Sequence, residues 1–379
     1  MSRGFPSRAP SRLAMIGIGV LVGLVLSELG VRVYAAVDHD LGRRLAETDP
    51  LGILVEAHGS IGYRQKPNKV FRYANGTSAT SNGMGFRGPE VNPTKPPGVT
   101  RVVLLGGSTT HGWGVRDDET IDASMRRLLA QRFPGQPFEV VNLAFDAYDS
   151  NQLVERLRSD GIPLSPDLLI VNAGINDVYN ARLQNLREDD PRTLFWQATL
   201  ERVRREQERG RPYLRTLAKH YSYFARLVSV VRRRNQIAET ESEGQAPNPE
   251  AANMFERNLR RIAQLAADHG MALLLSTPPS ALRINFAPNA RSSLSYWLAD
   301  ASATQAYRDT LAARMAGVAG ELAAQGMRVA YLRADISPSE YLDDCHLTPD
   351  GNRALGAAFV DATVRLLDAE SYWRPHAPR

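Results

Sequence analysis

Two residues that can carry out acid–base chemistry, Asp343 and His346, stand three positions apart near the carboxyl end of the chain. A neutral imidazole accepts a proton from a serine only when its other ring nitrogen is held as a donor, which a carboxylate on the same tight turn can do. A matching serine, Ser108, lies far upstream, where the apolar run at residues 102–105 ends in Gly-Gly-Ser. We therefore expect Ser108 to act as a nucleophile, His346 as its base and Asp343 as the group that orients the base. The alternative is a turn without a chemical role, in which Thr348 caps the last helix.

A third polar group follows another strand-like segment. Residues 167–172 form an apolar run that leads into Ala-Gly-Ile-Asn-Asp, so Asn176 falls just past the end of the expected strand. The transition state of acyl transfer carries negative charge on an oxygen, and an asparagine amide is one of the donors that can stabilise it. The pattern favours Asn176 as such a donor, although Asn176 and Asp177 also fit a simple turn.

These motifs together resemble one known superfamily. The Gly-Gly-Ser-Thr sequence around Ser108, the Gly-x-Asn-Asp sequence around Asn176 and the Asp-x-x-His pair follow the order and approximate spacing of the SGNH hydrolases, also called GDSL-like esterases. The resemblance implies a three-layer α/β/α domain of the flavodoxin-like type, an ester-hydrolase activity and no cofactor. It also implies the roles given above for Ser108, His346 and Asp343. The backbone N–H of Ser108 and the amide of Asn176 would then contribute to an oxyanion hole.

The sequence departs from the family pattern in the second block, where an asparagine is usually followed by a glycine whose backbone N–H completes the oxyanion hole. Here residues 142–148 read Asn-Leu-Ala-Phe-Asp-Ala-Tyr, and the alignment places Ala147 at the position of that glycine. A backbone donor does not require glycine, but an alanine with positive φ costs about 1 to 2 kcal/mol. We expect Ala147 to belong to the oxyanion hole, with either a negative φ or a displaced donor.

Composition and the remaining motifs narrow the classes of protein. With 379 residues, of which 43% are hydrophobic and 23% charged, the chain is long enough for one large domain with appendages. The single cysteine, Cys345, excludes an internal disulfide. The Gly-Gly-Ser sequence lacks the ending of a phosphate loop, and no spacing of His, Cys and Asp indicates a metal site. His111 has no carboxylate at a fixed spacing and is expected to line the wall of the site.

The amino terminus has the pattern of a membrane anchor or an export signal. Three arginines precede the uncharged stretch Leu13–Ser27, and no acidic residue occurs before Glu28. The stretch is short for a membrane span, which takes about 20 residues, unless the helix continues through residues 31–37 with Glu28 and Arg32 paired. The positive-inside rule then predicts an extracytoplasmic catalytic domain. An uncleaved anchor is favoured over secretion after cleavage near Ala35, and export argues against a nucleic-acid partner despite a sequence pI near 9.4.

The expected organisation has three parts. An anchor helix occupies residues 1–37, a spacer with short β-ribbons residues 38–99, and the catalytic domain residues 100–370, with a basic helical insertion at residues 190–250. In the spacer, Arg87 can either contact a substrate carboxylate or pack the spacer onto the domain, and the second role is the commoner one for such an arginine.

Strand-like and helix-like segments alternate through the catalytic domain, which predicts a parallel sheet with right-handed crossovers. The expected site residues then all fall beyond the carboxyl ends of strands, the edge at which open α/β sheets bind ligands. The expected strands are residues 101–105, 138–143, 167–172, 272–276 and 328–331, and the expected helices are residues 120–133, 151–159 and 254–269, with a closing helix that contains Leu355 and Leu366.

Two insertions have patterns of their own. Residues 192–234 are helical in pattern, strongly basic and interleaved with aromatic side chains. They can dock on acidic glycans or anionic lipid headgroups, or form a solvated hairpin packed on the domain. Residues 280–303, which include Tyr296 and Trp297, are expected to form a rim or lid at the active edge.

The expected reaction is two-step acyl transfer through an acyl-enzyme, with water as the final acceptor. The resemblance and the expected location point to a small acyl ester, such as an acetyl group on a carbohydrate. Two alternatives remain open, namely an O-acetyltransferase acting on an extracytoplasmic polysaccharide and a catalytically inactive glycan-binding module. The sequence indicates no oligomeric state.

Overall fold

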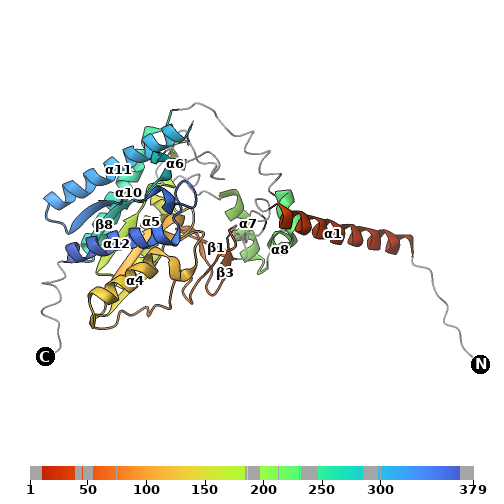
Figure 1. Ribbon diagram of the computed structural model, residues 1–379, viewed down its shortest axis with the longest axis horizontal. Helices are drawn as coiled ribbons and strands as arrows, with labels where there is room; N and C mark the ends of the chain where they lie inside the picture. Colours follow the sequence, from red (N-terminus) through yellow and green to blue (C-terminus); the bar gives the residue numbers. More distant parts are fainter. Residues whose placement is uncertain are drawn as a thin grey trace, which may run out of the picture.

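The computed structural model of the chain has an α/β body from which one long helix projects (Figure 1). The structure describes residues 11–38, 45, 54–73, 75–183, 186, 197–211, 213–229, 231, 246–284, 298 and 300–367. The two aromatic residues of the expected lid, Tyr296 and Trp297, lie outside this range.

A parallel sheet organises the body. Its strands are β5 (Thr100–Gly106), β6 (Phe138–Asn142), β7 (Leu168–Asn172), β8 (Ala272–Thr277) and β9 (Val329–Arg333). They follow the spatial order β6-β5-β7-β8-β9, which is the 2-1-3-4-5 order of flavodoxin-like folds. The central strands β7 and β8 are buried along their whole length because both faces of a parallel sheet are covered. The expected α/β/α architecture with a parallel sheet is confirmed.

Helices cover both faces of the sheet. They are α4 (Ile121–Arg132), α5 (Ser150–Arg156), α10 (Pro249–Asp268), α11 (Ala301–Ala324) and α12 (Pro349–Leu367). Successive side chains of a strand point to opposite faces, so Val102 and Leu104 of β5 pack with α4 and α12. Val103 and Leu105 pack in the cluster that contains α5, α10 and α11. Figure 1 shows α4 and α12 on one side of the body and α10 and α11 on the other.

One long helix of the body is not predicted by the sequence pattern. In α11, alanines and glycines are spread around the whole circumference, which blurs the apolar stripe that normally marks a surface helix. Its first residues, 301–303, belong to the expected second insertion, residues 280–303.

The spacer packs against the body. It forms two antiparallel ribbons, β1 (Val55–His58) with β2 (Gly62–Gln65) and β3 (Val70–Arg72) with β4 (Ser78–Thr80). Tyr63 and Phe71 of these ribbons lie in the same buried cluster as Val103 of β5. The spacer therefore shares a core with the sheet and can reach the residues at its edge.

The projecting helix is α1 (Arg12–Val37), and none of its most apolar window is buried, so it is long and apolar enough to cross a membrane. Glu28 and Arg32 form the expected ion pair at 2.7 Å. The described part of the basic insertion contains α7 (Gln197–Glu208) and α8 (Leu214–Tyr221), followed by helical residues 223–229. Figure 1 shows α8 at the inner end of α1, and α7 between α8 and the body.

Candidate active site

Ser108 is the first residue of the short helix α3 (Ser108–His111), directly after the carboxyl end of β5. Steric reasons favour glycine at both preceding positions. A Cβ on Gly107 would clash with the Nδ2 atom of Asn176. A Cβ on Gly106 would clash with the side chain of Thr110 and lie 2.8 Å from the carbonyl oxygen of Asn172. The Gly-Gly-Ser sequence thus lets the backbone pass close to two neighbouring segments at the point where the serine emerges.

Ser108, His346 and Asp343 lie together at the carboxyl edge of the sheet. The Nε2 atom of His346 is 2.8 Å from the Oγ of Ser108, and its Nδ1 atom is 2.7 Å from Oδ2 of Asp343. The other carboxylate oxygen accepts hydrogen bonds from the backbone N–H groups of Cys345 and His346, at 2.9 and 2.8 Å. The turn itself therefore fixes Asp343, which in turn holds Nδ1 as the donor and leaves Nε2 to accept from the serine.

The electrostatics of this turn favour a charged pair. Burial raises the pKa of Asp343, but the charge of His346 and the hydrogen bonds to the carboxylate outweigh it and lower the pKa to about 2. Burial lowers the pKa of His346, yet the negative charge of Asp343 and its hydrogen bond raise that pKa well above the ordinary value. The imidazolium that forms when the serine loses its proton is thereby stabilised, as a general base requires.

An aromatic wall covers the imidazole. The ring of Trp113 packs on His346 with centroids 4.6 Å apart and planes inclined by 33°, and Tyr73 packs on Trp113 at 5.5 Å. Trp113 was not among the expected site residues, and the only signal in the sequence is its position shortly after Ser108. This packing restricts rotation of the imidazole out of the plane that joins Ser108 and Asp343.

Asn176 stands just past β7, at the start of the short helix α6 (Asp177–Asn180). Its Nδ2 atom donates a hydrogen bond to the carbonyl oxygen of Tyr148 at 2.8 Å. Since a Cβ on Gly107 would meet this same Nδ2, the amide lies directly beside the residue that precedes the nucleophile. The structure thus brings Asn176 next to Ser108, as the motif order implied.

Ala147 adopts a φ of +59°, so the expectation of a negative φ at this position is wrong. The alanine is held in the left-handed region, at a cost of about 1 to 2 kcal/mol relative to glycine. It adjoins Tyr148, whose carbonyl oxygen accepts from Asn176. The backbone at this position thus has the conformation that glycine adopts most readily, and a role for the Ala147 N–H in the oxyanion hole stays a prediction.

His111 has a carboxylate partner that the sequence did not indicate. Its Nδ1 atom lies 3.1 Å from Oδ1 of Asp146, and its ring is buried against Phe145 at a centroid distance of 5.2 Å. The carbonyl oxygen of Asp146 also accepts a hydrogen bond from the hydroxyl of Tyr63 at 2.8 Å. The expectation that His111 lines the wall of the site is thus corrected, because its side chain is 0% exposed. It lies in the core and helps to hold the residue that precedes Ala147.

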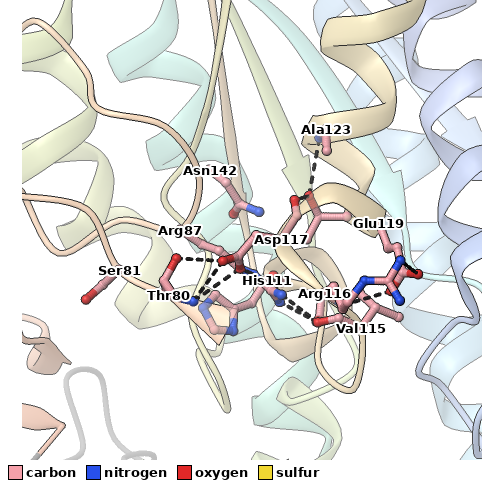
Figure 2. A network of polar contacts seen from close by, with 12 residues as sticks. Thr80, Ser81, Arg87, His111, Val115, Arg116, Asp117, Glu119, Ala123 and Asn142 are labelled. Carbon is pink, nitrogen blue, oxygen red and sulfur yellow. Dashed lines mark hydrogen bonds and ion pairs between the residues drawn. The ribbon is translucent and has the colours of Figure 1, made fainter. Parts of the chain in front are cut away.

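Arg87 organises the loop that follows the nucleophile (Figure 2). Its Nε atom donates to Asp117 at 3.0 Å, and its terminal nitrogens donate to the carbonyl oxygens of His111, Gly112 and Val115. Its side chain is 0% exposed. A substrate carboxylate cannot reach it, so the structure supports the packing role of Arg87 over the binding role.

Asp343, Cys345 and His346 also place three atoms that can ligate a metal within 4.8 Å of one another, a grouping that the sequence spacing did not predict. The hydrogen bond between Asp343 and His346 accounts for two of these atoms. Cys345 is buried, and burial raises the pKa of its thiol, which keeps it protonated. The thiol is therefore neither a good ligand nor a good nucleophile.

Several solved structures are similar to this chain. A catalytic mutant of an acetylxylan esterase from Geobacillus stearothermophilus shares 14% identity, with 69% of this chain and 93% of that chain covered and a TM-score of 0.41. A GDSL-like lipase from Bacteroides thetaiotaomicron shares 16% identity, with 70% and 88% covered and a TM-score of 0.38. An α/β hydrolase enzyme from the metagenome of Lake Arreo, Spain, shares 18% identity, with 70% and 96% covered and a TM-score of 0.40.

The family of the chain follows from its sequence. No curated protein sequence matches it. The profile of the GDSL-like Lipase/Acylhydrolase family matches residues 104–354, which is more than half of the chain and runs from β5 into α12. The chain therefore belongs to the GDSL-like lipase/acylhydrolase family and is an ester hydrolase.

Proposed function

We propose that the chain cleaves a carboxylic ester with Ser108 as nucleophile, His346 as general base and Asp343 as the orienting carboxylate. The observation that carries the proposal is a continuous series of contacts. It runs from Oδ2 of Asp343 through both ring nitrogens of His346 to Oγ of Ser108, over 2.7 and 2.8 Å. A serine hydroxyl becomes a nucleophile when an oriented imidazole can take its proton, and this is the arrangement that does so.

In the first step, Nε2 of His346 takes the proton of Ser108 as Oγ attacks the ester carbonyl carbon. The negative oxygen of the tetrahedral intermediate accepts hydrogen bonds from the backbone N–H groups of Ser108 and Ala147 and from the amide of Asn176. An amide nitrogen carries two protons, so Asn176 can bind Tyr148 with one and the oxyanion with the other. The alcohol leaves with the proton from Nε2, and an acyl-enzyme remains.

In the second step, Nε2 of His346 takes a proton from water, which attacks the acyl carbon and releases the acid. Transfer to a sugar hydroxyl in place of water would make the same enzyme an acetyltransferase. The substrate we propose is a small acyl ester, such as an acetyl group on a carbohydrate outside the cytoplasm, and this rests on the family and on the location proposed next.

We propose that residues 1–37 anchor the chain in a membrane, with the spacer at 38–99 and the catalytic domain at 100–370 on the extracytoplasmic side. The length and apolar exposure of α1 support the anchor, and the arginines before it support the orientation. The masses of the protein recovered from the membrane fraction and from the soluble fraction test this proposal. An intact amino terminus supports the anchor, whereas a new terminus near Ala35 would indicate a cleaved signal.

The triad is tested by Ser108→Ala, with Ser339→Ala, an exposed serine, as the matched control. We expect Ser108→Ala to abolish hydrolysis of a small acetyl ester and covalent labelling by a fluorophosphonate, without a change in thermal unfolding. Ser339→Ala should retain both. Turnover or labelling that persists in Ser108→Ala would reject Ser108 as the nucleophile.

A further inference from the structure

The segment around α8 carries positive charge only. In α7, arginines alternate with glutamates, but this alternation ends at Glu208. From there to Glu239 the sequence has eight lysines and arginines and no acidic residue. Alternating signs are typical of a helix in water, whereas a basic amphipathic helix is typical of a membrane surface.

One face of α8 exposes apolar side chains. Leu214, Ala218 and Tyr221 stand at positions i, i+4 and i+7, so they share a face. Leu214 is 84% exposed and Tyr221 is 70% exposed. The opposite face points to the body, because Thr216 is buried and donates a hydrogen bond to Glu206 of α7. The exposed apolar face is therefore fixed in its direction by the packing of α8 on α7.

The membrane-type helix α1 is bonded to the end of α8. The carboxylate of Glu28 accepts hydrogen bonds from the hydroxyl of Ser222 at 2.7 Å and from the backbone N–H groups of Tyr223 and Phe224 at 3.0 Å each. Arg32, the ion-pair partner of Glu28, lies over the ring of Tyr223 at 4.5 Å. These contacts hold the residues that follow α8 against one level of α1.

That level falls at the boundary of the bilayer. The uncharged stretch Leu13–Ser27 has fifteen residues, and at 1.5 Å per residue it spans about 22 Å, less than the roughly 30 Å of a hydrocarbon core. Glu28 therefore lies at or just inside the boundary of the apolar layer, where an unpaired carboxylate would be costly. The hydrogen bonds from Ser222, Tyr223 and Phe224 satisfy that carboxylate. Tyr221 and Tyr223 adjoin Ser222, and tyrosines are enriched at the headgroup level of membranes.

We propose that α8 lies on an anionic membrane, with Leu214, Ala218 and Tyr221 in the boundary between headgroups and acyl chains. The exposed side chains of Arg209 and Arg211, next to the start of α8, would bind lipid phosphates, and the absence of acidic residues from the segment fits such a surface. The inference rests on the proposed anchor α1 and is independent of the esterase chemistry. It assigns the basic insertion the role of a second membrane contact that sets the orientation of the catalytic body.

Site-directed fluorescence on the full chain tests this proposal. The chain is placed in phosphatidylcholine vesicles with or without phosphatidylglycerol, and a cysteine-reactive fluorophore is attached at Leu214→Cys. Spin-labelled lipid serves as the quencher. Ala323→Cys, an exposed position of α11, is the aqueous control, and Leu21→Cys in α1 reports on the anchor. The only native cysteine is buried, so the parent chain gives the labelling background.

We expect quenching at Leu214→Cys to exceed that at Ala323→Cys by at least about twofold. The difference should be larger with phosphatidylglycerol and smaller at high salt.

Equal quenching at Leu214→Cys and Ala323→Cys, with strong quenching at Leu21→Cys, would overturn the membrane contact of α8 but keep the anchor. No quenching at Leu21→Cys would overturn both. Protection of Leu214→Cys from iodide without lipid quenching would mean that a protein covers this face, which also overturns the proposal. The Ser108→Ala assay is unaffected by any of these outcomes.

Discussion

Gly107, which precedes the nucleophile, leaves room for the side-chain amide of Asn176. Because a Cβ on Gly107 would clash with the Nδ2 of Asn176, we expect Gly107→Ala to displace the amide from the oxyanion. The loss of one such donor typically lowers kcat by a factor of about 10² to 10³. Steady-state kinetics on a small acetyl ester measure this, with KM little changed. Gly320→Ala in α11, where nothing lies near the added Cβ, is the control and should retain full activity. A loss confined to KM would contradict an oxyanion role for Asn176.

The pH dependence of the reaction reports on Asp343. His346 must be neutral to act as a base, and Asp343 raises its pKa. The value of kcat/KM should therefore rise with pH through a midpoint above the ordinary histidine pKa of about 6.5. In Asp343→Asn the charge is gone, so the midpoint should move to lower pH, while kcat falls by a factor on the order of 10⁴ because the tautomer is no longer fixed. The pH–rate profiles of the two proteins decide this, and identical midpoints would remove Asp343 from its assigned role.

At the residue scale, the sequence could indicate only groups that local motifs carry. Ser108, Asn176 and the pair Asp343 and His346 each stand in a short pattern at a strand end, and the structure brings them together. The contact of His111 with Asp146 joins residues 35 positions apart, so no fixed spacing could reveal it. The alignment of Ala147 with a glycine raised the question of a positive φ, but alanine itself gives no sign of a left-handed backbone, so only the structure could answer it.

At the element scale, the spacer supports the site through Tyr63 of β2. Its hydroxyl donates to the carbonyl oxygen of Asp146, one residue before Ala147, at 2.8 Å. We expect Tyr63→Phe to loosen this loop and lower kcat by up to about tenfold, since a hydrogen bond is worth about 0.5 to 1.5 kcal/mol. The matched control is Tyr307→Phe, because the buried hydroxyl of Tyr307 has no hydrogen-bond partner among the described residues. Equal kcat values for the two variants would mean that the spacer does not position Ala147.

The elements of the body differ in how well the sequence predicts them. The strands were predictable because each is a short apolar run that ends at Gly, Asn or a polar residue, as β5 and β7 show. The helix α10 was predictable because Phe255, Leu259 and Ile262 mark one buried face. In α11 the same signal is absent, since small residues occur on the exposed face as well as on the buried one. Periodicity fails when alanine occupies both faces of a helix.

At the scale of the whole molecule, two polar contacts connect parts that are distant in the sequence. The side chain of Gln207 in α7 accepts a hydrogen bond from the backbone of Ala57 in β1 at 2.7 Å, which ties the basic insertion to the spacer. Glu28 ties α1 to the same insertion through Ser222. The path from the membrane-type helix to the catalytic edge thus runs through contacts of the insertion and the spacer, and not only along the chain. The distance of the site from the membrane would then be set by packing.

A buried acidic pair makes the stability of the whole molecule depend on pH. Burial raises the pKa of Asp177 to about 7, with the charge of Asp149 acting in the same direction and the hydrogen bonds from Ser150 opposing it. The unfolded chain releases this proton near pH 4, so the folded state holds more protons between about pH 4 and 7. Stability contributed by the protonated form is therefore present below this window and is lost as pH rises through it.

Asp177→Asn keeps an oxygen that can accept from Ser150 but carries no charge. We expect the variant to gain stability over the parent by on the order of 1 to 3 kcal/mol at pH 8, and to show no gain near pH 4. Thermal unfolding of both proteins across this pH range measures the difference. Asp118→Asn, in which the side chain is 71% exposed, is the control and should leave the pH dependence unchanged. Parallel curves of stability against pH for the parent and Asp177→Asn would contradict this. They would show that Asp177 is already charged in the folded state and that the surrounding side chains compensate its charge.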